Sequence, residues 1–324
     1  MSSAKPFVGQ DAAWQEWLGA VASGRMHHAW LLSGAKGLGK KAFARAAAIE
    51  LLGESGGKAA DAASHPDIHI LAHLPSNDDE AKKKAEGKPY QTKRNITIDQ
   101  IRRMQQRLTT RPTLGSRRAI IIDPADDLEK NAVNALLKSL EEPPTGTYFL
   151  LVTHQPGRLL PTVRSRCRVL RFAALAPDEL DAVIRREVPE ADAEARAAAI
   201  AASRGSPGVA LNFVEHDLGG IHRLMMQILQ EGDETFHLRG ALADEMGARP
   251  PRDRQVAALE LARSVLVAEL PGAPRTRQMK IIEAHGTLTS LSMQAPVYNF
   301  DAGLLIMEIG GLLASAAMPR ETAR

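Results

Sequence analysis

The chain has 324 residues, enough for about two or three domains that each bury a core of their own. Hydrophobic residues make up 44% and charged residues 24%, which excludes disordered, collagen-like and coiled-coil classes, and the 4% of aromatic residues disfavours an all-β sandwich or barrel. The net charge of +3 permits contact with nucleic acid but does not argue for it.

Short β-rich runs alternate with helical runs between His28 and Phe172, a pattern typical of a parallel sheet with crossover helices. The expected strands are Ala29 to Ser33, Ile68 to Ala72, Ala119 to Asp123, Tyr148 to Thr153 and Val169 to Phe172. The expected helices are Lys41 to Leu52, Asp99 to Thr109 with Asp99 as its cap, Lys130 to Leu140, and a short one near Arg158 to Arg164. Residues 1–172 are therefore predicted to form an α/β domain.

Strand signals almost vanish after Phe172. Residues 173–217 are predicted to be a small helical domain of three helices, at Pro177 to Val188, Ala191 to Arg204 and Val209 to Val214. Residues 218–324 are predicted to be all-α, with apolar periodicity at Leu224 to Leu229, Val256 to Leu270 and Leu304 to Leu313. The last of these runs on to Met318, but it contains Glu308 and is shorter than the roughly 20 apolar residues of a membrane span, so we expect no membrane contact.

A glycine-rich sequence, GAKGLGK at residues 34–40, lies between an expected strand and an expected helix. Gly34, Gly39 and Lys40 have the spacing G-x-x-x-x-G-K of a phosphate-binding loop, and Gly37 adds a further flexible position. In such a loop backbone N–H groups turn inward and the lysine reaches the outer phosphates. The next residue should be Ser or Thr to hold Mg²⁺, but it is Lys41, a cation that would repel the metal. The sequence is also compatible with a strand-to-helix turn that never contacts a nucleotide.

Asp123 ends an apolar strand, the place where phosphate-loop ATPases have a carboxylate that orients Mg²⁺. Many of them follow it with a Glu that polarises the attacking water, whereas Pro124 here has neither a carboxylate nor an N–H. Lys41 and Pro124 thus both fall on the metal and water site. Asp123 as a simple strand-end cap is a comparable interpretation.

Two further motifs flank the strand that ends at Thr153: LLKSLEEPP at residues 136–144 and SRC at residues 165–167. Glu141 and Glu142 precede two prolines, so we prefer a solvated helix end to a pair of catalytic carboxylates. Cys167 is the only cysteine, which excludes an internal disulfide and a cysteine-built zinc site. We interpret it as a small buried residue instead of a nucleophile and expect a reduced, cytoplasmic protein.

The order of these motifs resembles the clamp-loader branch of the AAA+ ATPases and, within it, the delta-prime family of bacterial DNA polymerase III. The resemblance runs from about His27 to Leu211, and the helical remainder agrees with the family's collar in length and helicity only. It implies a RecA-like AAA+ domain with a parallel sheet, a three-helix lid and an all-α collar that joins a hetero-oligomeric ring. It also implies a non-motor subunit, an accessory of the polymerase that has neither polymerase nor ATPase activity of its own.

The same resemblance suggests roles for single residues. Arg166 is similar to the arginine finger that clamp-loader subunits present to ATP on a neighbouring subunit, and Thr153 is similar to the first sensor of the terminal phosphate. The second sensor, an arginine in motor subunits, is replaced by Gly208. The implied partners are motor and clamp-opening subunits, the sliding clamp and primed DNA. No cofactor is required, although weak binding of ATP or ADP without magnesium is compatible with the loop.

The family often carries a four-cysteine zinc module after its first helix, and residues 51–66 contain no cysteine, so we expect no zinc. His65, His69 and His73 have i, i+4 spacing, but Pro66 and the β-like run after it argue against one helical face and hence against a metal site.

Residues 81–94 contain six basic residues and one Glu, which favours a solvated loop or, as an alternative, a stripe that contacts DNA phosphates. Two other functions therefore stay open: an active ATPase that uses Asp123 in an unusual metal arrangement, and a free-standing DNA-binding protein that uses Lys82 to Lys84.

Overall fold

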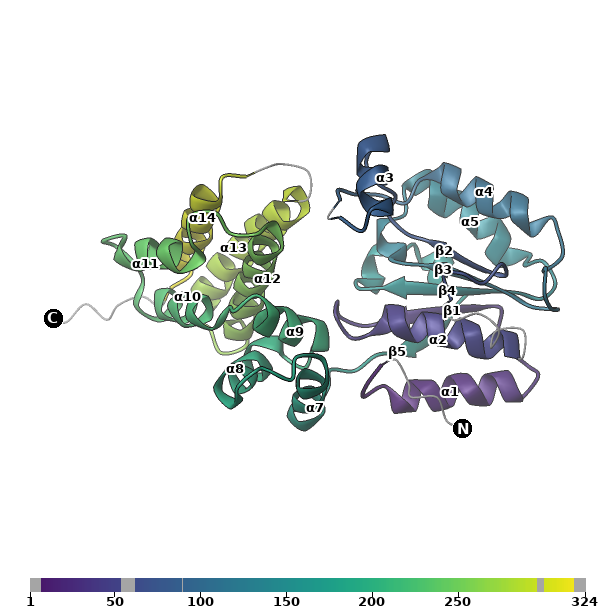
Figure 1. Ribbon diagram of the computed structural model, residues 1–324, viewed down its shortest axis with the longest axis horizontal. Coiled ribbons are helices and arrows are strands. Elements are labelled where there is room, and N and C mark those ends of the chain that lie inside the picture. Colours follow the sequence, from purple (N-terminus) through teal and green to yellow (C-terminus); the bar gives the residue numbers. More distant parts are fainter. Residues whose placement is uncertain (1–6, 54–61, 89, 296–299, 318–324) are drawn as a thin grey trace. The chain divides into compact units, whose positions relative to one another are not determined.

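The computed structural model describes residues 7–53, 62–88, 90–295 and 300–317 (Figure 1). The chain divides into two compact units, Met1–Ala174 and Leu175–Arg324. The first boundary lies within two residues of the expected one. The segments expected as a lid and a collar, from Leu175 on, lie together in the second unit, and their separation into two domains stays a prediction.

The first unit is built on a five-stranded parallel sheet (Figure 1). Its strands are β1 (Ala29–Ser33), β2 (Ile68–Leu71), β3 (Arg118–Ile122), β4 (Thr147–Thr153) and β5 (Arg168–Arg171), in the order β2-β3-β4-β1-β5. All five predicted strands are confirmed to within one residue at each end. Runs such as Ile120 to Ile122 are buried, as a sheet covered on both faces requires.

Helices cover both faces of this sheet (Figure 1). On one face α1 (Asp11–Ala22) and α2 (Lys40–Leu52) pack on Trp30, Leu32 and Ile121, with Trp17 and Phe43 at the centre. On the other face α4 (Ile98–Leu108), α5 (Lys130–Glu141) and the short α6 (Pro161–Arg164) pack on the alternate strand residues. This alternation points consecutive strand residues into opposite cores. Because the strands are parallel, the carboxyl ends of β1, β3 and β4 lie at one edge of the sheet.

Two helices of the first unit differ from the sequence prediction. Helix α1 and helix α3 (Asp78–Ala85) were not predicted. The expectation that Asp99 caps α4 is wrong, because Thr97 is the residue before the helix and its N–H donates to the Gln100 side-chain oxygen at 3.1 Å. Asp99 instead lies in the first turn, where a carboxylate is favourable to the helix dipole.

Among its described residues the second unit contains helices joined by turns and no strand. It contains α7 (Pro177–Glu187), α8 (Ala193–Ser203), α9 (Pro207–Glu215), α10 (Gly219–Glu231), α11 (His237–Met246), α12 (Arg252–Glu269), α13 (Arg275–Gln294) and α14 (Ala302–Ser315). The three predicted short helices and the three later periodic stretches are confirmed as helices, whereas α11 and α13 were not predicted. Over the described ranges, no helix combines the length and the hydropathy that crossing a membrane requires.

Candidate functional site

The glycine-rich loop connects β1 to α2 at the carboxyl edge of the sheet. Gly37 and Gly39 have φ angles of 84° and 78°, which glycine adopts without strain. Gly34 has no room for a side chain, because a Cβ there would lie 2.7 Å from the carbonyl oxygen of Phe172. The turn therefore needs these glycines for its own geometry, whether or not a phosphate binds.

Lys40 begins α2 and turns back into the loop. Its Nζ donates to the carbonyl oxygens of Gly34 at 2.7 Å and Ala35 at 2.5 Å, and the residue is 2% exposed. Burial lowers the pKa of Lys40 to about 8, although the carboxylates of Asp123 and Asp126 act in the opposite direction. The ammonium that would meet a phosphate is thus engaged by two carbonyl groups of its own loop, while Lys41 points to an exposed position.

Asp126 is a site residue that the sequence analysis missed. It lies in a short 3₁₀ turn, η2 (Ala125–Asp127), just beyond β3. Its carboxylate accepts hydrogen bonds from the Thr153 hydroxyl, from the His154 N–H at 2.5 Å and from the Gln155 N–H at 3.3 Å. Thr153, the expected sensor, is therefore held by an anion of its own chain. The signal in the sequence was a second Asp soon after Asp123, just beyond the strand next to the one that ends in Thr153.

The structure brings together Lys40, Asp123, Asp126 and Thr153, at the ends of β1, β3 and β4. His154 joins this cluster, and burial, followed by the nearby Lys40, lowers its pKa. Gly208, at the position of the second sensor, belongs to α9 in the second unit.

Arg166 lies on the tight turn between α6 and β5. Its Nη2 is 2.7 Å from Glu141 Oε1, and its Nη1 donates to the Thr162 carbonyl oxygen at 2.8 Å. Glu141 is the last residue of α5 and is half exposed, but it is an ion-pair partner as well as a helix end. The LLKSLEEPP and SRC motifs therefore meet. Burial raises the pKa of the Cys167 thiol to about 12, which does not suit a nucleophile.

The histidines singled out in the sequence have separate surroundings. His65 Nδ1 accepts the Asp67 N–H at 3.0 Å, His69 faces Arg107, and His73 lies 3.2 Å from Asp127. Among the residues that the structure describes, no three His, Cys, Asp or Glu side chains are grouped as metal ligands. Much of the stretch where the family's zinc module would lie, residues 54–61, is outside the described residues.

The lysine-rich segment expected as a loop is partly helical, because α3 begins at Asp78 and ends at Ala85. Acidic residues on and just after the helix pair with lysines of the segment: Lys82 with Asp79 at 3.6 Å, Lys83 with Glu80 at 2.6 Å and Lys88 with Glu86 at 2.7 Å. The expectation of a plain loop is wrong because the helix starts upstream of the basic run, where Asn77 caps it by accepting the Glu80 N–H at 2.9 Å.

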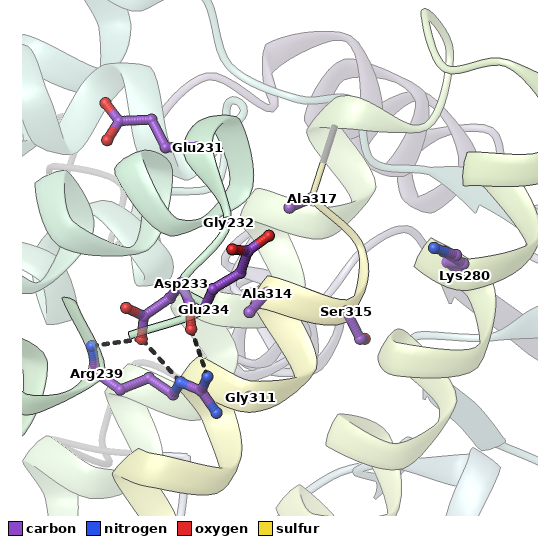
Figure 2. A pocket seen from close by; sticks show the side chains of 10 residues that line it. All are labelled: Glu231, Gly232, Asp233, Glu234, Arg239, Lys280, Gly311, Ala314, Ser315 and Ala317. Atoms are coloured by element: carbon purple, nitrogen blue, oxygen red, sulfur yellow. Dashed lines mark hydrogen bonds and ion pairs between the residues drawn. The ribbon is translucent and has the colours of Figure 1, made fainter. Parts of the chain in front are cut away.

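A cavity of about 490 Å³ lies elsewhere, in the second unit, between the end of α10, the start of α11, α13 and the end of α14 (Figure 2). Figure 2 shows the Arg239 side chain hydrogen-bonded to the Asp233 carboxylate. Asp233 is the most buried charged side chain of the cavity wall, and this ion pair engages it. None of the predicted site residues lines this cavity.

Comparison with known proteins identifies the family. The family model described as DNA polymerase III, delta subunit, matches residues 9–176, just over half of the chain. The DNA polymerase III subunit delta' of Pseudomonas aeruginosa is 34% identical over 209 residues, 60% of this chain and 58% of the relative. That of Escherichia coli is 33% identical over 224 residues, 63% of this chain and 62% of the relative.

The chain thus covers less than two thirds of the length of either relative. A solved structure of a DNA polymerase III gamma subunit-related protein from Thermotoga maritima is 17% identical, with a TM-score of 0.49 over 94% of this chain and 99% of that one. From the family model and the sequence relatives, the chain belongs to the delta-prime family of DNA polymerase III subunits.

Proposed function

We propose that this chain is a non-motor subunit of a bacterial DNA polymerase III clamp loader and supplies Arg166 in trans to ATP bound on a neighbouring subunit. The observation that carries the proposal is Arg166 itself. It occupies the family's SRC motif on a surface turn, with its side chain 33% exposed. A guanidinium is permanently charged and can fork two hydrogen bonds onto a phosphate, which suits stabilisation of charge during hydrolysis next door.

The non-motor assignment is supported by three departures from a working ATPase: Lys41 at the magnesium ligand, Pro124 at the water-polarising residue and Gly208 at the second sensor. One arginine finger alone is worth roughly 10³ to 10⁵ in rate, so three losses leave little hydrolysis. Two retained residues, Lys40 and Thr153, are also engaged within the chain. The subunit would act as a structural and activating neighbour instead of a motor.

Partners and location follow from the same proposal. The helices from α10 to α14 would form the part that joins a ring with motor and clamp-opening subunits. The assembled complex would place the sliding clamp on primed DNA in the cytoplasm. The chain would require neither a cofactor nor zinc.

Nucleotide binding is the part of the proposal that Gly34, Gly39 and Lys40 leave open. A phosphate would have to displace the two carbonyl groups from Lys40, so affinity for ATP or ADP should be weak. Because Lys41 replaces the residue that would hold Mg²⁺, this affinity should not depend on magnesium. Calorimetric titration should give weak heats that are equal with and without Mg²⁺, and no heat at millimolar nucleotide would reject binding.

The test of the finger is reconstitution with the motor and clamp-opening subunits. Arg166→Ala should leave assembly intact and reduce hydrolysis at the neighbouring site by about 10³-fold or more, together with clamp loading. Arg164→Ala is the matched control, since Arg164 is an exposed arginine two residues away, at the end of α6. Normal hydrolysis and loading with Arg166→Ala would reject the proposal, and turnover by the isolated chain that Lys40→Ala abolishes would make it an active ATPase.

A further inference from the structure

We infer that Glu141 is a positioning residue that restrains the arginine finger, so that a neighbour's phosphate must displace this carboxylate before Arg166 can act. The inference rests on the proposed function of Arg166. It assigns a role to a residue of the LLKSLEEPP motif that sequence reasoning left as a helix end.

Both terminal nitrogens of the Arg166 guanidinium are engaged within the chain. Nη2 contacts Glu141 Oε1 at 2.7 Å, and Nη1 donates to the Thr162 carbonyl oxygen at 2.8 Å. A phosphate that takes a forked pair of hydrogen bonds uses either Nη1 and Nη2 or Nε and Nη2, so in both arrangements it takes the Nη2 that Glu141 contacts. Glu141 and an incoming phosphate are both anions, so they compete for one cation.

The backbones on either side of the ion pair are fixed. The His28 ring donates to the Leu140 carbonyl oxygen at 2.9 Å, which ties the end of α5 to the start of β1. The Arg166 N–H donates to the Val163 carbonyl oxygen at 3.2 Å, and the Val163 side chain on α6 is fully buried in the core that α5 also covers. Release of the finger is therefore a movement of the Arg166 side chain and needs no rearrangement of the fold.

The pair is exposed enough to open. The Arg166 side chain is 33% and the Glu141 side chain 48% exposed, so water and a docking subunit can reach both. Exposed ion pairs are weak, and their loss changes an equilibrium by about 1.4- to fivefold, which corresponds to ~0.2–1 kcal/mol. A contact of this strength restrains the finger without preventing its use.

Reconstituted complexes test the inference through kcat/KM for ATP in the presence of clamp and primed DNA. Glu141→Gln keeps the shape and removes the charge, and should raise kcat/KM by up to about fivefold. Glu142→Gln makes the same charge change on the adjacent exposed glutamate and should leave the value unchanged. In an Arg166→Ala background, Glu141→Gln should have no effect, which a merely structural role of Glu141 would not predict.

Salt supplies a second readout. Because an exposed ion pair is screened, the ratio between Glu141→Gln and wild type should fall towards one between about 0.05 M and 0.5 M NaCl. If the Glu141→Gln complex has a kcat/KM equal to or below that of wild type at low salt, while Arg166→Ala still loses hydrolysis, the restraint is rejected and the role of Arg166 as a finger is kept. An Arg166→Ala complex as active as wild type overturns the proposed function, and the restraint with it.

Discussion

The Lys40 ammonium has exchanged water for protein groups. Its contacts are the carbonyl oxygens of Gly34 and Ala35, and the carboxylates of Asp123 and Asp126 act on it from the ends of β3 and the following turn. Loss of hydration nevertheless dominates, so the pKa falls from 10.5 to about 8. The folded chain therefore gives up the Lys40 proton at a lower pH than the unfolded chain does.

This difference makes stability depend on pH. Between about pH 8 and 10.5 the unfolded chain keeps a proton on Lys40 that the folded chain has released, so the free energy of unfolding should rise with pH in this window. From about pH 7.5 to 9.5, wild type should gain up to about 2 kcal/mol relative to Lys40→Met. Urea unfolding at both pH values measures the gain.

Lys41→Met is the control for this measurement, because Lys41 is the exposed neighbour on the same helix. It should track wild type at both pH values. If the difference between wild type and Lys40→Met is the same at both, Lys40 keeps an ordinary pKa and the argument fails.

The sequence located the site residues that belong to motifs and missed those defined by pairing across the fold. Spacing located the loop, and the resemblance to the clamp-loader family pointed to Thr153 and Arg166. Asp126 was missed because its partner Thr153 lies 27 residues further along the chain, on the adjacent strand. The Glu141 contact joins residues 25 positions apart, and an exposed glutamate before two prolines gives no hint of it.

Helix α3 is stabilised mainly by the charged residues at its two ends. Asp78, Asp79 and Glu80 occupy its first turn and Lys82 to Lys84 its last, an arrangement that favours the helix dipole. Glu80 is 7% exposed, and its carboxylate also accepts the Gln91 N–H at 2.6 Å, which ties the helix to the returning chain. Residues 81–94 contain the cations but not the three acids of the first turn, and so suggest a loop.

Glu80→Ala should therefore release α3 while the sheet stays intact. Removing a buried charged acceptor leaves the Gln91 N–H without its partner and should weaken the local structure by about 1–3 kcal/mol. Amide hydrogen exchange should speed up about tenfold or more across residues 78–91 and remain unchanged in β1 to β5. Asp79→Ala, which removes an 83% exposed carboxylate, should have little effect.

An equal loss of protection throughout the first unit in Glu80→Ala would contradict this local role. So would unchanged exchange in α3.

The strands were predictable and some helices were not, for reasons of periodicity. A strand buried on both faces is a short continuous run of apolar residues, as in Ala119 to Ile122, and can be recognised without any periodic spacing of those residues. Helix α13 was missed because the exposed Met279 and Ile282 break its apolar stripe. Helix α11 was missed because it is ten residues long and contains Gly240.

At the scale of the whole chain, breaks rich in glycine and proline suggest three domains. Such breaks show where helices end, but not which helices pack against one another. The Ser264 hydroxyl on α12 donates to the Ala202 carbonyl oxygen on α8 at 3.1 Å, and the rings of Phe213 and His222 meet edge to face. These contacts join residues on both sides of the expected boundary near residue 217. The sequence alone does not show them, because they link helices that are distant along the chain.

The strand order has a consequence for how the protein is made. β1 lies between β4 and β5, so the apolar segment Ala29–Ser33 has no strand partner until residues 147–171 have been synthesised. At ribosomal rates of about 5–20 residues per second, that wait is roughly 6 to 30 seconds. During this time Trp30, Leu31 and Leu32, all nearly fully buried in the finished sheet, have no strand beside them. The strand that leads into the glycine-rich loop is thus the one in this sheet that waits longest for its strand partners.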